Sequence, residues 1–447
     1  MRIPAAVLGV LAVMGWSSNA WAQEDEKAKR NKEESIEERL KALEQKTQSV
    51  PLDSKDPLVT WTANNGLKFK SGDGNFEGAI GGRFYFIFRH IFDRVDAGGT
   101  LPDTFAVDTA RIQLDGTFYK DFYYRVETEF AKTGSFTLKD GYIGWKGLED
   151  VAIQFGQMKE PFSQEETCSS RFIDFSERSI LNRLVPDHDI GIMGKGTLAE
   201  KIVEWELGLF NGASRNGAAR NANDVNDEKD IVLRVRANPF RTSTNDWIKG
   251  MRVGLAYGVG DVDTTAIGDI TTADFGGLTV FDFTGNEDGL RKRMGVEFSW
   301  IMGPWSVRAE YMSQNQEVLT ATGHDDFDIN GYYVQATYLL TGEDKPLENR
   351  IKPKKNFSIK DGGWGAWELA LRFASLDASD GEQAGVIAAG SNQKVNEITF
   401  GVNWWMTPNV RLVLNFERFQ FDKDIPQAGA SAISDQNIFY TRLQIDF

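Results

Sequence analysis

The sequence is short of features that would place it in several common classes. It has one cysteine, Cys168, so an intramolecular disulfide framework is excluded. It has three histidines and contains no H-E-x-x-H motif, no phosphate-cradling glycine loop and no nucleophile elbow. A formal net charge of −15 disfavours binding to nucleic acid. We therefore predict neither an enzyme nor a nucleic-acid partner, and we predict no cofactor and no metal site.

Long hydrophobic runs are missing as well. The segment 1–22 has the pattern of a signal peptide, with a basic start at Arg2, a short apolar stretch, and Ala20 and Ala22 in the cleavage site. The apolar stretch falls short of the roughly 20 residues that a membrane helix needs, and no later stretch comes near that length. The sequence predicts export. A membrane barrel stays open, because each of its strands needs only every second residue to be apolar.

Two short segments follow the predicted signal peptide. Residues 23–50 are dense in charge, and Ile36, Leu40 and Leu43 recur at four- and three-residue steps, which predicts a short periplasmic helix. This helix is either a coiled coil or a solvated tail. Residues 51–65 begin within "VPLDSKDPL", whose prolines predict a linker. The remainder, 66–447, is predicted to be one domain.

From Phe76 onward, apolar and polar residues alternate in a way that predicts β-strands. In "ARIQLDGTF", Ile112 and Leu114 share one face, while Arg111 and Gln113 share the other. The same alternation occupies the final stretch, "FYTRLQIDF". A further apolar alternation at 67–70 suggests an extra strand before the first. Sixteen main strands are predicted, at 76–93, 105–119, 122–131, 136–145, 151–158, 189–197, 202–210, 230–238, 248–259, 291–301, 304–312, 329–340, 364–377, 394–406, 409–421 and 438–447.

The connections between these strands alternate between long and short, which is typical of outer-membrane barrels. Only 132–135 and 341–363 depart from this rule. Tryptophans lie near strand ends, where a membrane interface favours them. The predicted fold is therefore all-β: a 16-stranded antiparallel transmembrane β-barrel with a short N-terminal helical extension. The predicted location is the outer membrane of a Gram-negative cell, where lipid and lipopolysaccharide surround the barrel.

The polar faces of the strands are predicted to line a water-filled lumen, because a barrel of this size is too wide for side chains to fill. The inward acids are about as numerous as the inward basic residues. The arginines therefore either recognise anions, which suits a planar guanidinium, or brace the wall against the acids. The predicted inward basic residues are all arginines: Arg83, Arg89, Arg111, Arg125, Arg234, Arg236, Arg252, Arg293, Arg308, Arg372, Arg411 and Arg442.

The long connection 159–188 is the predicted constriction. Its aromatic and aliphatic residues indicate that it is packed, and we expect it to fold into the barrel. Its basic residues would then face a permeating solute, with serines beside them, unless its own acids pair with them. These residues are Lys159, Arg171, Arg178 and Arg183, with Ser163, Ser169 and Ser170.

Three segments of the chain resemble the phosphate-selective porin family, the porin O and P family: "GQMKEPFSQEETCSSRFIDFSERS", "GAWELALRFASLD" and "GVNWWMTPNVRLVLNFERFQ". The resemblance implies a trimeric outer-membrane porin through which anions pass. It also implies that a lysine and an arginine of the folded-in loop bind phosphate. Lys159 and Arg171 occupy the corresponding places, with Ser163 near the lysine.

The functional hypothesis is a porin that lets small anions such as phosphate diffuse through a constriction lined by arginine and lysine. We predict that the constriction is formed by Lys159, Ser163, Arg171 and Arg178 of the loop, together with Arg83, Arg89, Arg111 and Arg125 of the wall. The predicted assembly is a homotrimer. The alternatives are a general or cation-preferring porin, or a barrel whose main role is anchoring or adhesion.

Overall fold

The computed structural model describes most of the chain from Leu58 to Phe447. The described residues are 58–62, 66–92, 95–96, 99–100, 103–131, 136–212, 227–273, 277–320, 323–427 and 430–447. The predicted signal peptide, the predicted helix at 23–50 and part of the predicted linker lie outside them. No helix among the described residues is long and apolar enough to cross a membrane.

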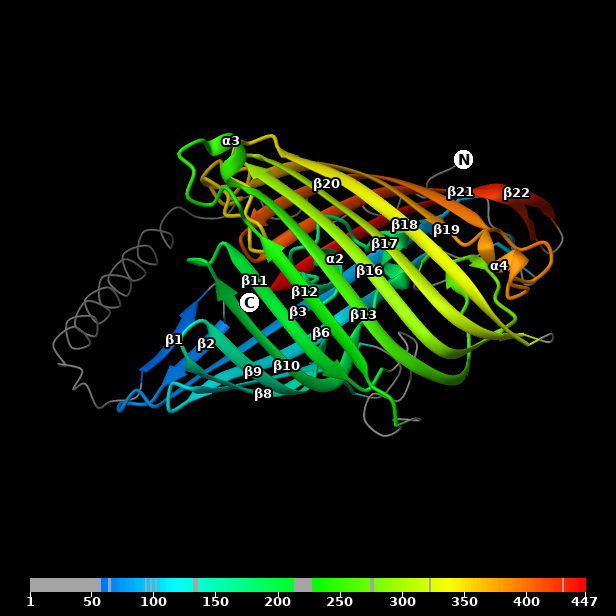
Figure 1. The fold of residues 1–447 in the computed structure, drawn as a ribbon. Helices are drawn as coiled ribbons and strands as arrows, with labels where there is room; N and C mark the ends of the chain where they lie inside the picture. Colours follow the sequence, from blue (N-terminus) through cyan, green and yellow to red (C-terminus); the bar gives the residue numbers. More distant parts are fainter. Residues whose placement is uncertain are drawn as a thin grey trace, which may run out of the picture. The chain divides into compact units, whose positions relative to one another are not determined.

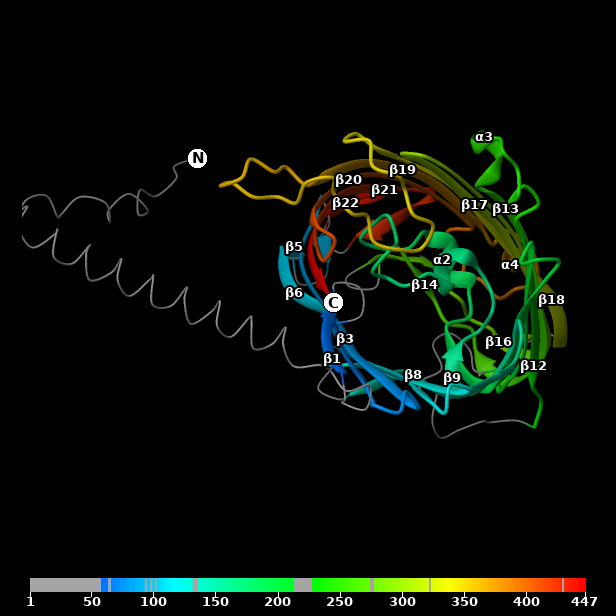
Figure 2. The same ribbon diagram turned by 90° about the vertical axis from the view of Figure 1, so that its left-hand side faces the viewer.

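Sixteen antiparallel strands form a closed barrel, as the alternation predicts, and the strands tilt steeply across its wall (Figures 1 and 2). Each strand pairs with its neighbours in chain order, and the last strand pairs with the first. The strands are β3 (Phe76–Ile91), β6 (Thr104–Phe118), β7 (Phe122–Glu129), β8 (Thr137–Leu148), β9 (Val151–Lys159), β10 (His188–Leu198), β11 (Val203–Phe210), β12 (Asp230–Ala237), β13 (Met251–Ala266), β16 (Asn286–Met302), β17 (Trp305–Thr320), β18 (Gly323–Leu339), β19 (Ala366–Asp377), β20 (Lys394–Thr407), β21 (Val410–Gln427) and β22 (Ala430–Asp446).

The C-terminal strand closes the cylinder. In the β22–β3 ladder, Leu443 lies opposite Phe86 and Asp446 lies opposite Arg83. The backbone N–H of Phe447 then donates to the carbonyl of Gly82 at 3.0 Å. Strand β22 therefore has a paired neighbour on each side, which removes the exposed edge that its sequence would otherwise leave.

The two faces of each strand meet different surroundings. Along β17, Arg308 and Glu310 are buried in the interior, whereas Tyr311 is exposed on the outside. On β6 and β11, the apolar side chains of Ile112 and Leu207 are exposed on the outer face. In a water-soluble protein this would be an apolar surface without a partner, but in a bilayer it contacts lipid.

Strand length is the main difference between the prediction and the structure. Strand β17 runs to Thr320 and β21 to Gln427, well beyond the predicted ends at 312 and 421. Beyond residue 312 of β17 the outward-facing residues are polar (Ser313, Asn315 and Glu317), and in β21 Asp422 and Asp424 are exposed, so the alternation on which the prediction depended is lost. For the same reason, the predicted long connection at 422–437 is mostly strand, because β22 begins at Ala430.

A short hairpin precedes the barrel. Its strands are β1 (Leu58–Thr62) and β2 (Gly66–Lys70), so the predicted extra strand is present and β1 lies within the range predicted as a linker. Strand β2 continues the sheet beside the first residues of β3. The ring of Trp61 stacks on the ring of Phe447, with centroids 5.4 Å apart. The hairpin therefore covers the last residue of the chain.

Several connections fold inward and fill one side of the lumen (Figure 2). Connection 160–187 carries α2 (Gln164–Thr167) and the 3₁₀ turn η1 (Ile180–Leu184), and connection 267–285 carries the hairpin of β14 (Ile270–Thr271) and β15 (Thr279–Phe281). Together with the connection around α4 (Asp380–Gln383), they form an apolar core inside the barrel. The remaining short elements are β4 (Val95–Asp96), β5 (Gly99–Thr100) and α3 (Asp246–Lys249).

Candidate functional site

The inward connection 160–187, here called the constriction loop, begins with a capped helical turn. Ser163 has a positive φ of 66°, and its Oγ accepts a hydrogen bond from the N–H of Glu166 at 3.2 Å. This is the usual role of an N-cap serine. Phe162 just before it and Leu181 further on are buried in the apolar core. The loop is therefore held inside the barrel by apolar packing and has its own local hydrogen bonds.

Polar contacts fix the far side of this loop to the opposite wall. Arg411 of β21 donates to the backbone carbonyl of Ile173 at 2.7 Å. The Asp174 carboxylate lies 2.6 Å from the Lys345 Nζ, which also contacts the Glu368 carboxylate of β19. Lys345 belongs to the connection between β18 and β19, at the end of the barrel with the short turns. That connection therefore supports the constriction loop from the other end of the lumen.

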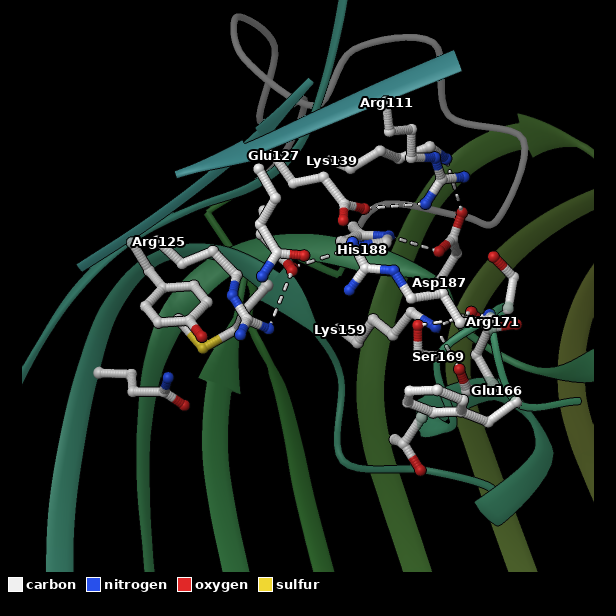
Figure 3. A pocket seen from close by; sticks show the side chains of 18 of the residues that line it. Arg111, Arg125, Glu127, Lys139, Lys159, Glu166, Ser169, Arg171, Asp187 and His188 are labelled. Atoms are coloured by element: carbon white, nitrogen blue, oxygen red, sulfur yellow. Dashed lines mark hydrogen bonds and ion pairs between the residues drawn. The ribbon is translucent and has the colours of Figure 1, made fainter. Parts of the chain in front are cut away.

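A cavity of about 550 Å³ separates the near side of the loop from the wall. Strands β3 and β6–β11 provide the wall. Figure 3 shows side chains that line the cavity, among them Arg111, Lys159 and Arg171. Its lining contains more basic than acidic side chains, although the chain as a whole is acidic. The nine basic residues are Arg83, Arg111, Arg125, Lys139, Lys159, Arg171, Arg178, Arg183 and Lys195, and the five acidic ones are Glu127, Asp140, Glu166, Asp187 and Glu206.

Six of the eight predicted constriction residues line this cavity: Arg83, Arg111, Arg125, Lys159, Arg171 and Arg178. The other two, Ser163 and Arg89, do not. Ser163 is buried and serves as the helix cap. Arg89 is buried further along β3, toward the end of the barrel with the long loops.

The wall arginines are braced by carboxylates. Arg111 lies 2.9 Å from the Glu127 carboxylate and 2.7 Å from that of Glu129, and Arg83 also contacts Glu127. Arg125 lies 2.6 Å from the Asp115 carboxylate. These pairs support the bracing interpretation of the wall. Such contacts orient each guanidinium, and the group can still attract an anion in the cavity.

Lys159, at the end of β9, and Arg178 of the constriction loop are also engaged. The Lys159 Nζ lies 3.1 Å from the Glu166 carboxylate and contacts the Glu166 backbone carbonyl. Arg178 lies 3.3 Å from the same carboxylate and donates to the Glu165 carbonyl at 3.0 Å. Glu166 therefore links the two cations.

Of the basic residues that line the cavity, Arg171 has the most buried nitrogens without a partner among the described residues, two, whereas Arg83 has one. The Nε and Nη2 atoms of Arg171 are buried and have no hydrogen-bond partner within the described part of the chain. Burial, followed by the like charge of Arg83, lowers the pKa of the Arg171 guanidinium to about 10, so it stays charged at neutral pH. Arg83 donates to the hydroxyls of Ser170 at 2.8 Å and Ser169 at 3.2 Å. Buried donors are normally satisfied, so two unsatisfied nitrogens on one side chain are an unusual feature of this cavity.

The structure also brings residues to the cavity that the sequence prediction missed. Lys139 and Lys195 line it, so the inward basic residues are not all arginine as expected. Lys195 lies two residues after the buried Met193 on β10, so the two side chains share the inner face. This spacing could have identified Lys195 from the sequence. His188 lies between Asp187, at 2.6 Å, and Asp140, at 3.3 Å. The aspartates beside His188 are visible in the sequence, but a pairing across strands is not.

Cys168 lies in the constriction loop and is fully buried. Burial raises the pKa of its thiol to about 11, so the unreactive thiol form prevails at neutral pH. It acts as a small packed side chain. In the parts of the chain that the structure describes, no group of three or more His, Cys, Asp and Glu residues is arranged to hold a metal ion.

A closed barrel with an apolar outer face and a charged internal cavity defines a porin, a channel of the outer membrane. Residues 88–447 match the family model of the phosphate-selective porins O and P. The chain belongs to this family. It is therefore a multi-pass outer-membrane barrel and a channel, not an enzyme.

Individual relatives agree with this assignment. Porin O of Pseudomonas aeruginosa is 25% identical over 432 residues, which cover 89% of this chain and 94% of that protein. The anion-selective porin from Comamonas acidovorans has a TM-score of 0.52 at 14% identity, covering 83% of this chain and 100% of the other. A trimer form of OmpT from Vibrio cholerae has a TM-score of 0.50 at 11% identity, covering 83% and 99%. At these identities, the two structures support the fold alone.

Proposed function

We propose that the protein is a passive diffusion channel for small anions such as phosphate, and that the constriction beside Arg171 selects them. The observation that carries the proposal is a cavity with nine basic and five acidic side chains, in which Arg171 keeps two buried nitrogens without a hydrogen-bond partner. An anion placed there would accept hydrogen bonds from Arg171 and lie close to Arg83 and the Ser170 hydroxyl.

Phosphate suits this arrangement chemically. A guanidinium presents a planar fork of donors that matches phosphate oxygens. The Arg83–Glu127 contact holds the second guanidinium in place, and Ser169 and Ser170 supply hydroxyls beside it. The carboxylates of Glu127 and Glu166 keep the site from binding too strongly, and a channel requires its solute to leave.

Each of the two alternative hypotheses predicts a different lumen. A cation-preferring channel needs carboxylates to dominate the narrowest part, yet basic residues exceed acidic ones in the cavity lining. A barrel used only for anchoring needs a filled lumen, and the inward connections fill one side but leave about 550 Å³ beside the wall. Measurement of conductance and ion preference distinguishes both alternatives from the proposal.

The proposal includes a homotrimer that contacts lipid and lipopolysaccharide with its remaining outer surface. Strand β7 has eight residues, fewer than the roughly 9–11 that a tilted strand needs to span a bilayer. Beside it, the outer face of β6–β9 is hollowed by about 610 Å³ and lined by aromatic and aliphatic side chains such as Phe118, Phe122 and Phe155. Neighbouring copies would cover this short, hollowed arc. Mass measurement of the detergent-solubilised protein tests the assembly, and a monomer would contradict it.

The experiment for selectivity is the reversal potential in a potassium chloride gradient across a planar bilayer. We expect anion preference, and we expect added phosphate to reduce the chloride current. Cation preference would contradict the anion proposal. The absence of any conductance would favour an anchoring role.

A further inference from the structure

A second cavity of about 180 Å³ lies between the constriction loop, the inward connection 267–285 and the wall of β16–β18. It is here called the upper cavity, because it lies toward the end of the barrel with the long loops. Arg183 lines both this cavity and the cavity at the constriction. A solute in the upper cavity is therefore next to the proposed anion path.

One side of the upper cavity is apolar. The rings of Phe283 and Phe327 meet edge to face, with centroids 5.5 Å apart, and Ile329, Ile267 and Leu184 complete this side. Phe327 is 3% exposed, whereas Phe283 is only partly buried. An apolar wall is unfavourable for an inorganic ion, because the ion loses hydration there without compensation. The apolar side therefore suits a solute that has an apolar part.

The other side of the upper cavity is polar and contains three arginines and two carboxylates. Arg291 lies 3.0 Å from the Asp230 carboxylate, and Arg293 lies 3.3 Å from the same group. Asp230 stands behind the cavity lining and keeps both guanidinium groups oriented. The buried Oε1 of Gln316 has no hydrogen-bond partner among the described residues. The polar side thus provides guanidinium donors and one unsatisfied acceptor, and its three arginines are balanced by the carboxylates of the lining together with Asp230 behind it.

We propose that the upper cavity binds small amphipathic organic anions, such as an aromatic carboxylate, before they pass the constriction. The carboxylate would face the arginines, and the ring would lie against Phe283 and Phe327. The size agrees, because an apolar cavity of about 150 Å³ is known to hold a benzene ring. This inference rests on the proposed function, since the solute leaves the upper cavity past Arg183 into the constriction.

The test compares block of the chloride current by benzoate, acetate and phosphate, each added on the side of the long loops. Benzoate should block at a concentration about three- to tenfold lower than acetate, the gain expected for aromatic contacts. Phe327→Ala and Phe283→Ala should each remove most of this advantage and leave the block by phosphate within about twofold. Phe283→Ala keeps the test valid if the buried Phe327 is needed for folding. Phe373→Ala, which removes an exposed ring from the outer face of β19, is the matched control.

The outcomes separate the two proposals. If the channel prefers anions but benzoate blocks no better than acetate, the upper cavity is only a gap in the packing and this inference is wrong. If both Phe variants change phosphate and benzoate block equally, the rings act through structure, which also overturns it. A cation-preferring channel contradicts the proposed function, whatever benzoate does.

Discussion

Arg171 provides the sharpest test of the proposed anion site. Arg171→Ala removes a guanidinium whose Nε and Nη2 make no hydrogen bond in the described part of the chain, so little native structure is lost with it. A hydrogen bond to a charged group contributes about 1.5–3 kcal/mol. If phosphate accepts one such bond from Arg171, the phosphate concentration that halves the chloride current should rise roughly 10- to 150-fold.

Two further variants separate this specific contact from a general change in charge. Arg252→Ala removes a lumenal arginine whose guanidinium lies 3.7 Å from the Glu204 carboxylate, and Arg252 is not among the residues lining the cavity. It should change the phosphate block by less than about threefold. Arg171→Lys keeps the charge without the planar fork, so it should fall between wild type and Arg171→Ala. Equal shifts in Arg171→Ala and Arg252→Ala, or no shift in either, would refute the assignment of Arg171.

Three other outcomes follow from the same contacts. Lys159→Met should raise the half-blocking phosphate concentration by about threefold or less, and adding Glu166→Gln should reverse this, because the two side chains offset each other at 3.1 Å. Burial raises the pKa of Glu160 to about 8 from an ordinary 4.5, so the contribution of this group to stability should be greatest below about pH 4.5 and fall as the pH rises to about 8. Glu160→Gln should flatten that profile in denaturant unfolding. Lys345→Met should lower the free energy of unfolding by about 3–5 kcal/mol, because Asp174 loses its buried partner.

The Lys345 prediction has a matched control within the chain, and each of the other two has a result that would contradict it. Lys354→Met removes an exposed lysine from the same connection as Lys345 and should leave the unfolding temperature unchanged within error. An unchanged pH profile in Glu160→Gln would show that another group causes the fall in stability. A double variant of Lys159 and Glu166 that blocks no better than Lys159→Met would mean that their charges act separately on the solute.

The barrel was predictable because its physical cause is local. A strand that crosses lipid has one apolar face, so every second residue along it is apolar. Leu443 and Ile445, which alternate with Arg442 and Gln444, show this pattern. All sixteen strands were found from this signal. It disappears where a strand leaves the bilayer, and for that reason the outer ends of β17 and β21 were predicted too short.

The site was predictable in residue type but not in pairing. The phase of the strands placed Arg83 and Arg111 inward, and their position in the cavity follows from that phase. Their partner, Glu127, lies on β7, which is next to the strand of Arg111 and two strands from that of Arg83, and the register between strands decides whether the three meet. The alternation within one strand does not show which of its residues lie opposite which residues of the next strand. Which guanidinium nitrogens remain unsatisfied is therefore a property of the folded lumen.

The acidic net charge of the chain and the basic cavity are compatible because of where the acids lie. Asp325, Asp326 and Asp328 of β18, and Asp422 and Asp424 of β21, are exposed at the strand ends beyond the apolar band. Water and salt screen such charges over about 8–10 Å. Charges that line a narrow cavity are screened much less, so a solute at the constriction responds to the local excess of basic side chains. We therefore propose that selectivity is set by the few residues around Arg171, for which the formal charge of −15 is a poor guide.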